Sequence, residues 1–386
     1  MAKETLTVKN FGPIREAHLD LRKVTVLIGE QASGKSVLAK LAAIFSDILL
    51  EVRHLDSIWD FYNLKSYASE KSTVSFKGAN FSFSVQENIV NETVDDSILT
   101  YFEEYQKTRE QWEQVLLNSQ IKSTMTDEDR ERFRANREEM RVRRKYLAGI
   151  GGVPKYFPAE RSLVSVLSKS IYKLVDNEIP MPRFLIDFAD EYAIARQTIS
   201  QFEIRFLNVN YAFQKGKDKI VFGKNQEIEL FESATGFQTA IPMTVVIESL
   251  QEKGKHLFII EEPELNLYPT TQKKLVEYLV EKCTKGDNRL ILTTHSPYIL
   301  TALNNCIQAR NTLREHPEHS DEVAKLVRPE SQIDFEDVMA YFVAGGTAKP
   351  IMNNENRLID ANALDDISNE LSETFDRLLD LEMQPA

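Results

Sequence analysis

Residues 24–36 read VTVLIGEQASGKS, and the fold can be worked out from this stretch. The run VTVLI is short, apolar and rich in β-branched valine, which predicts a buried strand, and the residues from Ser36 onward, SVLAKLAAIFSDILLEV, have helical spacing. Between them, GEQASGKS matches the pattern G-x-x-x-x-G-K-[ST] in the strand, loop and helix context that this pattern requires. The sequence therefore predicts a phosphate-binding loop in an α/β fold.

The residue types of this loop suit ATP with Mg²⁺. Gly29 and Gly34 permit a tight turn whose backbone amides face the phosphates, and Lys35 is expected to place its ammonium on the β/γ oxygens. Ser36 offers a hydroxyl to Mg²⁺ at the N-terminus of the helix. We therefore assign the following residues to ATP binding: Gly29, Gln31, Ala32, Ser33, Gly34, Lys35, Ser36 and Val37.

Carboxylates follow a second apolar run, in residues 257–269, LFIIEEPELNLYP. A phosphate loop needs a metal-orienting carboxylate and a base at the end of a neighbouring strand. Glu261 is expected to orient Mg²⁺ or its waters, and Glu262 to polarise the water that attacks the γ-phosphate, a contribution of ~10²–10⁴-fold in rate. Glu261 stands where aspartate is usual, and its longer side chain is expected to shift the geometry of the metal site.

Apolar runs and turn residues predict the surrounding elements. HLFII (256–260) and RLILTT (289–294) flank a helical stretch at 270–283, which predicts neighbouring parallel strands joined by a crossover. Residues 73–85 alternate apolar and polar positions around Gly and Asn, which predicts a hairpin. Residues 218–232, DKIVFGKNQEIELFE, predict a second hairpin. The core is therefore predicted to be α/β.

Two stretches resemble motifs of the soluble ABC-type ATPases of the SMC/OLD-like group. SATGFQ (233–238) is similar to the ABC signature sequence, with Thr235, Gly236 and Gln238 at the matching serine, glycine and glutamine. EEPELNLYP (261–269) resembles the joined Walker B and D-loop of that group. Phe237 stands where the signature has a glycine.

A third stretch, TTHSPYIL (293–300), places His295 where those ATPases have the switch histidine that reads the γ-phosphate. NFGPI (10–14) and PAERS (158–162) also resemble segments of the group, and within PAERS either Glu160 or Arg161 is the candidate for the Q-loop position. The resemblance extends over roughly residues 3–305.

The resemblance implies a P-loop NTPase of ABC-ATPase type, with a mixed sheet flanked by helices and a helical-hairpin insertion. It also implies two nucleotide sites at a head-to-tail dimer or higher homo-oligomer, each with Lys35 and Ser36 from one subunit and the signature Thr235 and Gly236 from the other. Gln238 of the same motif is also assigned to nucleotide binding. The implied catalytic residues are Lys35, Glu262 and His295. Hydrolysis would then separate or rotate the subunits.

Four regions are predicted along the chain: an N-terminal part of the ATPase core (1–96), a helical hairpin (97–150), a C-terminal part of the core (151–310) and a C-terminal helical extension (311–386). In the hairpin, Arg130–Lys145 contains eight basic and three acidic residues. We interpret this stretch first as a solvated, ion-paired helix face, with an acidic partner or a nucleic-acid backbone as the alternatives.

Composition limits the partners. With 47 basic and 59 acidic residues the net charge is −12, so the surface as a whole repels nucleic acid and anionic membranes. No apolar stretch reaches 18 residues and no leader pattern is found, so we expect a cytoplasmic protein without a membrane partner. Cys283 and Cys306 are expected to be two packed thiols.

Several functions remain open. The first is an ATPase that acts as sensor and scaffold for a separately encoded effector such as a nuclease, as in the anti-phage systems PARIS and Septu. The second is a DNA-repair or chromosome-handling clamp, which would need Arg130–Lys145 to contact DNA. A transporter subunit and a regulatory module without hydrolysis are the further alternatives. No acidic cluster resembling a TOPRIM nuclease follows the ATPase motifs, so we expect the chain itself to cut nothing.

Overall fold

The computed structural model describes residues 4–47, 55–86, 89–96, 152–167, 181–223, 226–252, 254–360 and 372–379, together with isolated positions between 99 and 107. Apart from those isolated positions, the hairpin predicted for residues 97–150 lies outside the described residues, as does the whole of Arg130–Lys145. No helix in the described ranges is long and apolar enough to cross a bilayer.

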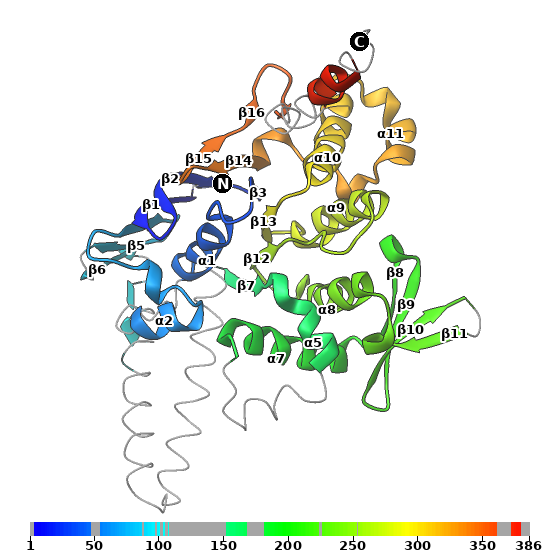
Figure 1. Cartoon of the computed structure of the whole chain (residues 1–386), viewed down its shortest axis with the longest axis horizontal. Helices are drawn as coiled ribbons and strands as arrows, with labels where there is room; N and C mark the ends of the chain where they lie inside the picture. Colours follow the sequence, from blue (N-terminus) through cyan, green and yellow to red (C-terminus); the bar gives the residue numbers. More distant parts are fainter. Residues whose placement is uncertain are drawn as a thin grey trace, which may run out of the picture.

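An eleven-stranded mixed sheet runs through the molecule, which confirms the predicted sheet (Figure 1). Five of its strands are parallel: β7 (Val153–Phe157), β12 (His256–Glu261), β13 (Arg289–Thr294), β3 (Val24–Ile28) and β14 (Val338–Ala344). The sheet continues through β15 (Thr347–Pro350), β2 (Ile14–Leu21), β1 (Glu4–Phe11), β4 (Thr73–Lys77), β5 (Phe81–Gln86) and β6 (Ile89–Val94). Because the carboxyl ends of parallel strands lie at one edge, the loops after β3, β12 and β13 come together there.

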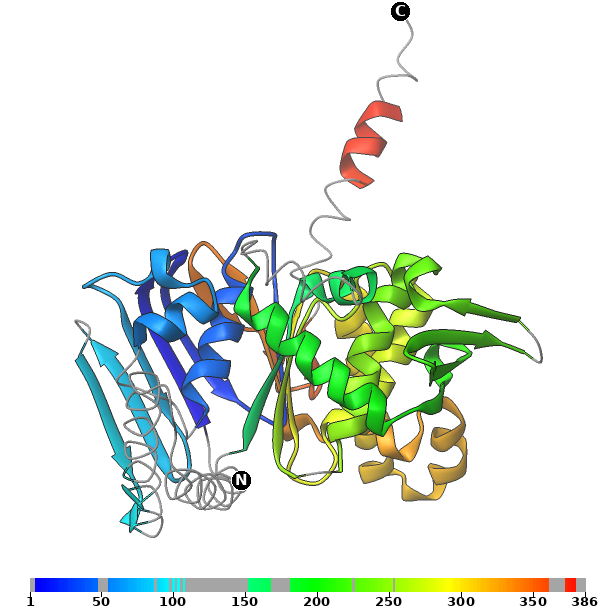
Figure 2. The ribbon, with the colours of Figure 1, turned by 90° about the horizontal axis from the view of Figure 1, so that it is seen from below.

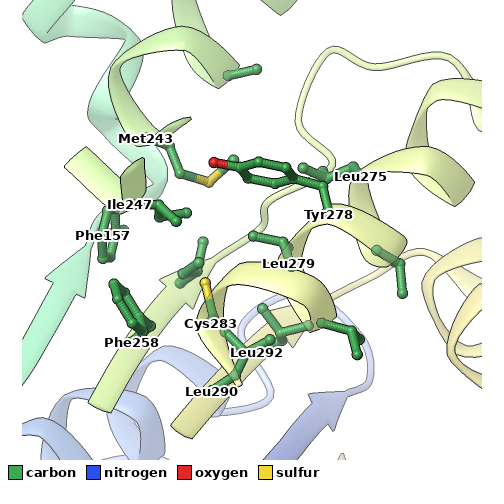
Figure 3. Packing of buried hydrophobic residues seen from close by; sticks show 14 of the residues in the cluster. Phe157, Met243, Ile247, Phe258, Leu275, Tyr278, Leu279, Cys283, Leu290 and Leu292 are labelled. Carbon is green, nitrogen blue, oxygen red and sulfur yellow. The ribbon is translucent and has the colours of Figure 1, made fainter. Parts of the chain in front are cut away.

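The parallel strands are buried on both faces, and successive residues alternate between two cores. One face packs against α7 (Arg183–Thr198), α8 (Thr235–Leu250), α9 (Pro269–Cys283) and α10 (Pro297–Glu315). Figure 3 shows Phe258 of β12 and Leu292 of β13 facing Ile247 of α8 and Leu279 of α9. Each such side chain contributes about 1.5–3 kcal/mol on burial.

α1 (Lys35–Phe45), the helix that follows the phosphate loop, packs against the opposite face of the sheet. Leu257, Ile259 and Ile291 belong to the same buried cluster as α1 and the N-terminal strands. The sequence KSVLAKLAAIF is apolar around most of its circumference, and nine of its eleven residues are buried, as expected for a helix enclosed by other elements. This enclosure fixes the start of α1 against the end of β3.

The C-terminal region differs from the predicted helical extension. After α10 and α11 (Ser320–Leu326), residues Val338–Ala344 form β14 in the centre of the sheet, where they pair in parallel with β3 from Val338↔Val24 to Phe342↔Ile28. The physical reason is the run VMAYFVA, which is apolar enough for a strand buried on both faces. In Figure 1 the orange β14 and β15 lie beside the blue β2 and β3.

Both predicted hairpins are confirmed. β4 pairs with β5, and β10 (Lys217–Phe222) pairs with β11 (Gln226–Glu229). The second hairpin belongs to a four-stranded sheet with β8 (Gln201–Ile204) and β9 (Val209–Gln214), on the side of the molecule away from the N-terminal strands (Figure 2). Three short elements complete this account: α2 (Leu55–Phe61), α5 (Ser162–Leu167) and the pair β16 (Met352–Asn353) with β17 (Leu358–Ile359).

Candidate functional site

The loop between β3 and α1 depends on glycine at both ends. Gly29 has φ 153° and Gly34 has φ 106°, backbone conformations that side chains disfavour. A Cβ at Gly29 would lie 2.2 Å from Val343 O of β14, and one at Gly34 would lie 2.4 Å from Ile14 Cδ1. The loop is therefore held between the start of β2 and the end of β14.

The other loop residues assigned to ATP differ in exposure. Gln31 and Ala32 are exposed, and Ala32 has a positive φ of 60°. Ser33 is half-buried, and its hydroxyl has no hydrogen-bond partner in the part of the chain that the structure describes. Val37 is buried in the core with α1, so only its backbone can face a phosphate.

We expect Gly34→Ala to abolish ATP binding and to lower the Tm, because alanine at this φ is strained by ~1–3 kcal/mol. The matched control is Gly286→Ala, which also has a positive φ, 59°, but whose Cβ would meet nothing within 4 Å. Binding is measured by titration with a fluorescent ATP analogue and stability by thermal unfolding. Normal ATP binding by Gly34→Ala would contradict this account of the loop.

Lys35 is buried and lies against the strand ends. Its ammonium donates to Gly29 O at 3.0 Å and Glu30 O at 2.9 Å, and lies 3.2 Å from His295 Nε2. Burial lowers the pKa of Lys35, and the nearby carboxylates of Glu262, Glu261 and Glu264 oppose this effect. The Lys35 amine thus lies among three acidic side chains.

Glu262 and His295 meet at the ends of β12 and β13. Glu262 Oε1 lies 3.2 Å from His295 Nε2, and Glu262 Oε2 accepts a hydrogen bond of 3.2 Å from the His295 backbone N–H. Burial and the charge of Lys35 lower the pKa of His295, which favours a neutral ring. The structure thereby brings together the three residues predicted to be catalytic, Lys35, Glu262 and His295.

The sequence analysis gave no role to Glu264, which is a third carboxylate in this cluster. Its side chain is buried, accepts from the Thr294 hydroxyl and accepts from the His295 backbone N–H at 3.2 Å. Burial, together with the neighbouring charge of Glu264, raises the pKa of Glu262 to about 8. The signal in the sequence was the spacing of EEPE, which returns a carboxylate to the same side after Pro263.

Glu261 and Ser36 are the residues predicted to hold Mg²⁺. Glu261 ends β12 and is buried, and its Oε1 has no hydrogen-bond partner among the residues described. Burial raises the pKa of Glu261, whereas Tyr156, Lys40 and the Ser36 hydroxyl favour its charged form. An unpartnered carboxylate oxygen with a hydroxyl beside it is a donor set that Mg²⁺ accepts, so the residues fit the ion.

The signature residues lie at the start of α8, against the D-loop. Thr235 is exposed, and a Cβ at Gly236 would lie 2.7 Å from Asn266 O. These residues line a pocket of about 300 Å³ with Leu267 and Tyr268. Gly236 of the signature thus packs against a D-loop residue, whereas Gly29 and Gly34 of the phosphate loop pack against Val343 of β14 and Ile14 of β2.

Gln238 differs from Thr235 in its environment. It is buried, and its amide nitrogen donates to Phe231 O and Ser233 O, both at 2.9 Å. In this structure Gln238 therefore braces the loop that precedes α8.

Comparisons with known proteins place this geometry in a family. The chain matches, over residues 24–301, the family described as "AAA domain, putative AbiEii toxin, Type IV TA system". Among solved structures, an SMC head bound to the C-winged helix domain of ScpA is similar at 10% identity and TM-score 0.44, covering 92% of this chain and 98% of that one. The SMC head domain from Thermotoga maritima is similar at 11% identity and TM-score 0.41, covering 91% and 98%.

The recombination mediator RecF is similar at 11% identity and TM-score 0.33, covering 90% of this chain and 98% of that one. A search of curated proteins found no match. The family match extends from β3, through the phosphate loop, the signature and the carboxylates, to the start of α10. The chain therefore belongs to this AAA-domain family, whose description names a putative AbiEii toxin of a type IV toxin–antitoxin system.

Proposed function

We propose that this protein binds and hydrolyses ATP and that two copies complete each nucleotide site. The observation that carries the proposal is the cluster at the ends of β3, β12 and β13. There His295 Nε2 lies 3.2 Å from Lys35 Nζ and also 3.2 Å from Glu262 Oε1. A cation on the phosphates and a side chain that orients the attacking water are recurring parts of phosphoryl transfer, and Lys35 and Glu262 can supply them beside the phosphate loop.

Each side chain has a separate task in this proposal. The amides of residues 29–36 and the Lys35 ammonium bind the β and γ phosphates, and Ser36 with Glu261 holds Mg²⁺, which when bound neutralises charge on the phosphates. The charged form of Glu262 accepts a proton from the attacking water, and because its pKa is raised to about 8, this form becomes more populated as the pH rises through that value. The His295 backbone N–H orients the Glu262 carboxylate, and the His295 ring lies between it and Lys35.

The exposure of the signature residue Thr235 beside the D-loop supports assembly. Thr235 and Gly236 open a pocket beside the D-loop, and in a head-to-tail pair they would complete the site of the other copy. Nucleotide would then hold the subunits together, and its hydrolysis would release or rotate them.

We expect Glu262→Gln to form a dimer or larger assembly with ATP and Mg²⁺, because it retains the binding residues but removes the base. Lys35→Ala, which loses the phosphate contact, should keep the same mass with and without nucleotide. Mass in solution is measured for both variants, beside the ATPase rate of the wild type. An assembly indifferent to nucleotide, together with no hydrolysis by the wild type, would contradict the proposal.

The role of sensor and scaffold is a further part of the proposal. The family's description names a putative toxin of a type IV toxin–antitoxin system, a system of two components, and this supports a chain that works with a separately encoded component, here an effector such as a nuclease. We place that pair in the cytoplasm and in anti-phage defence. Co-expression with the neighbouring gene product, followed by purification through either component, tests for such an effector.

A DNA-handling clamp is the second candidate, favoured by the eight basic and three acidic residues of Arg130–Lys145. If this stretch neutralises phosphates, duplex binding weakens with salt, with log K falling by about 0.9 per neutralised phosphate for each log unit of salt. Binding that is insensitive to salt, or absent, would leave the effector role.

A further inference from the structure

Arg161 is fully buried at the end of a short 3₁₀ helix, Ala159–Arg161, that follows β7. Its guanidinium donates to four backbone carbonyls: Pro158 O at 3.0 Å, Glu261 O at 2.6 Å, Glu262 O at 2.8 Å and Thr239 O at 3.2 Å. Burial lowers its pKa to about 10, so the group remains charged at neutral pH. A buried cation is tolerated only when it is well hydrogen-bonded, and here backbone oxygens supply the bonds.

Glu262 is strained where Arg161 holds it. Its φ is 41°, a left-handed conformation that is uncommon for a residue other than glycine. The N–H of Glu262 donates to Thr293 O at 3.0 Å, and its carbonyl accepts from Arg161 at 2.8 Å. Such strain persists only when surrounding groups fix it, and it directs the Glu262 carboxylate to His295.

The same guanidinium also contacts the signature helix. Thr239 lies one turn after Thr235 in α8, and its hydroxyl donates to Thr235 O at 2.9 Å. Asn266 of the D-loop donates to that hydroxyl at 3.3 Å. The start of α8, the D-loop and the backbone of Glu261 and Glu262 are therefore joined through Thr239 and Arg161.

We infer that Arg161 is a positioning residue, which fixes the strained backbone of Glu262 and makes the aim of its carboxylate depend on the position of the signature helix. This inference rests on the proposed ATPase function. A partner copy that moves α8 would thereby alter the alignment of the base without touching it. Arginine is required at this position, because its planar guanidinium has several N–H donors in a fixed arrangement and here donates to carbonyls of three elements.

The test compares Arg161→Met and Arg161→Lys with the wild type. We expect kcat for ATP hydrolysis to fall by on the order of 10–10²-fold in Arg161→Met, the cost of a small misplacement of a catalytic group, with KM within about twofold. Arg161→Lys keeps the charge without the fork, so it should recover only part of kcat. The matched control is Arg196→Met on α7, which should keep the wild-type kcat. It removes another largely buried guanidinium, one that pairs with Asp218 of β10 at 2.9 Å.

A second measurement does not depend on activity. Hydrogen exchange of peptides covering residues 258–268 should accelerate in both Arg161 variants but remain unchanged in Arg196→Met. Equal kcat and equal exchange in wild type and Arg161→Met would overturn the inference, as would a loss of kcat that Arg196→Met shares. If the wild type does not hydrolyse ATP, the proposed function fails, and the exchange of residues 258–268 still decides whether Arg161 positions Glu262.

Discussion

Glu262→Gln is expected to lower kcat for ATP hydrolysis by ~10²–10⁴-fold while ATP binding is retained. Glutamine keeps the size of the side chain and an oxygen that accepts the His295 backbone N–H, but it cannot take a proton from water. Steady-state hydrolysis and equilibrium binding of a fluorescent ATP analogue measure the two quantities separately.

Glu264→Gln provides the comparison for this variant. Glu264 contacts the Thr294 hydroxyl and the His295 backbone N–H, whereas Glu262 also lies 3.2 Å from the His295 ring, so the loss of Glu264 should lower kcat less than the loss of Glu262. A larger loss of kcat in Glu264→Gln than in Glu262→Gln would assign the base to Glu264 instead.

A chain that stops after residue 337 is expected not to fold. The truncation removes β14, in which Val338, Ala340, Tyr341 and Val343 are almost fully buried, and it leaves β3 without one of its two neighbours. At about 1.5–3 kcal/mol for each large apolar side chain, the loss approaches the ~5–15 kcal/mol of net stability that is typical of a domain. Soluble yield and far-ultraviolet circular dichroism report the result.

The control for the truncation stops after residue 360. It keeps all strands of the described sheets and removes residues 372–379, whose side chains are exposed. We expect the Tm of this shorter chain to stay close to that of the full chain. A soluble, helical protein ending at 337 would show that β14 is dispensable, contrary to its place between β3 and β15.

The strands next to the loop were predictable because they are buried on both faces. HLFII and RLILTT are continuous apolar runs, and the structure has β12 at His256–Glu261 and β13 at Arg289–Thr294. The loop between β3 and α1 was predictable from its glycines and lysine. Convergence of Lys35, Glu262 and His295 followed from the parallel order of the three strands, in which every carboxyl end lies at one edge.

The place of β14 was not predictable from local sequence. VMAYFVA has the composition of a buried strand, but its neighbour β3 lies about 300 residues earlier, and no periodicity in either segment specifies this pairing. The same limit applies to Arg161, since a run such as PAERS does not reveal that its arginine is buried against carbonyls of Glu261, Glu262 and Thr239. Gln238 is the opposite case. A motif match assigned it to nucleotide binding, but in the structure its amide nitrogen donates to the backbone carbonyls of Phe231 and Ser233.

The central position of β14 has a consequence for biosynthesis. Chains emerge from the ribosome N-terminus first, so residues 24–36 are made long before Val343, against which Gly29 is packed. Until β14 has been made, the phosphate loop lacks its contact with Val343, and one edge of β3 has no neighbouring strand. The phosphate loop is therefore enclosed only after residue 343 has been translated, and nascent chains that end before β14 lack one wall of the nucleotide site.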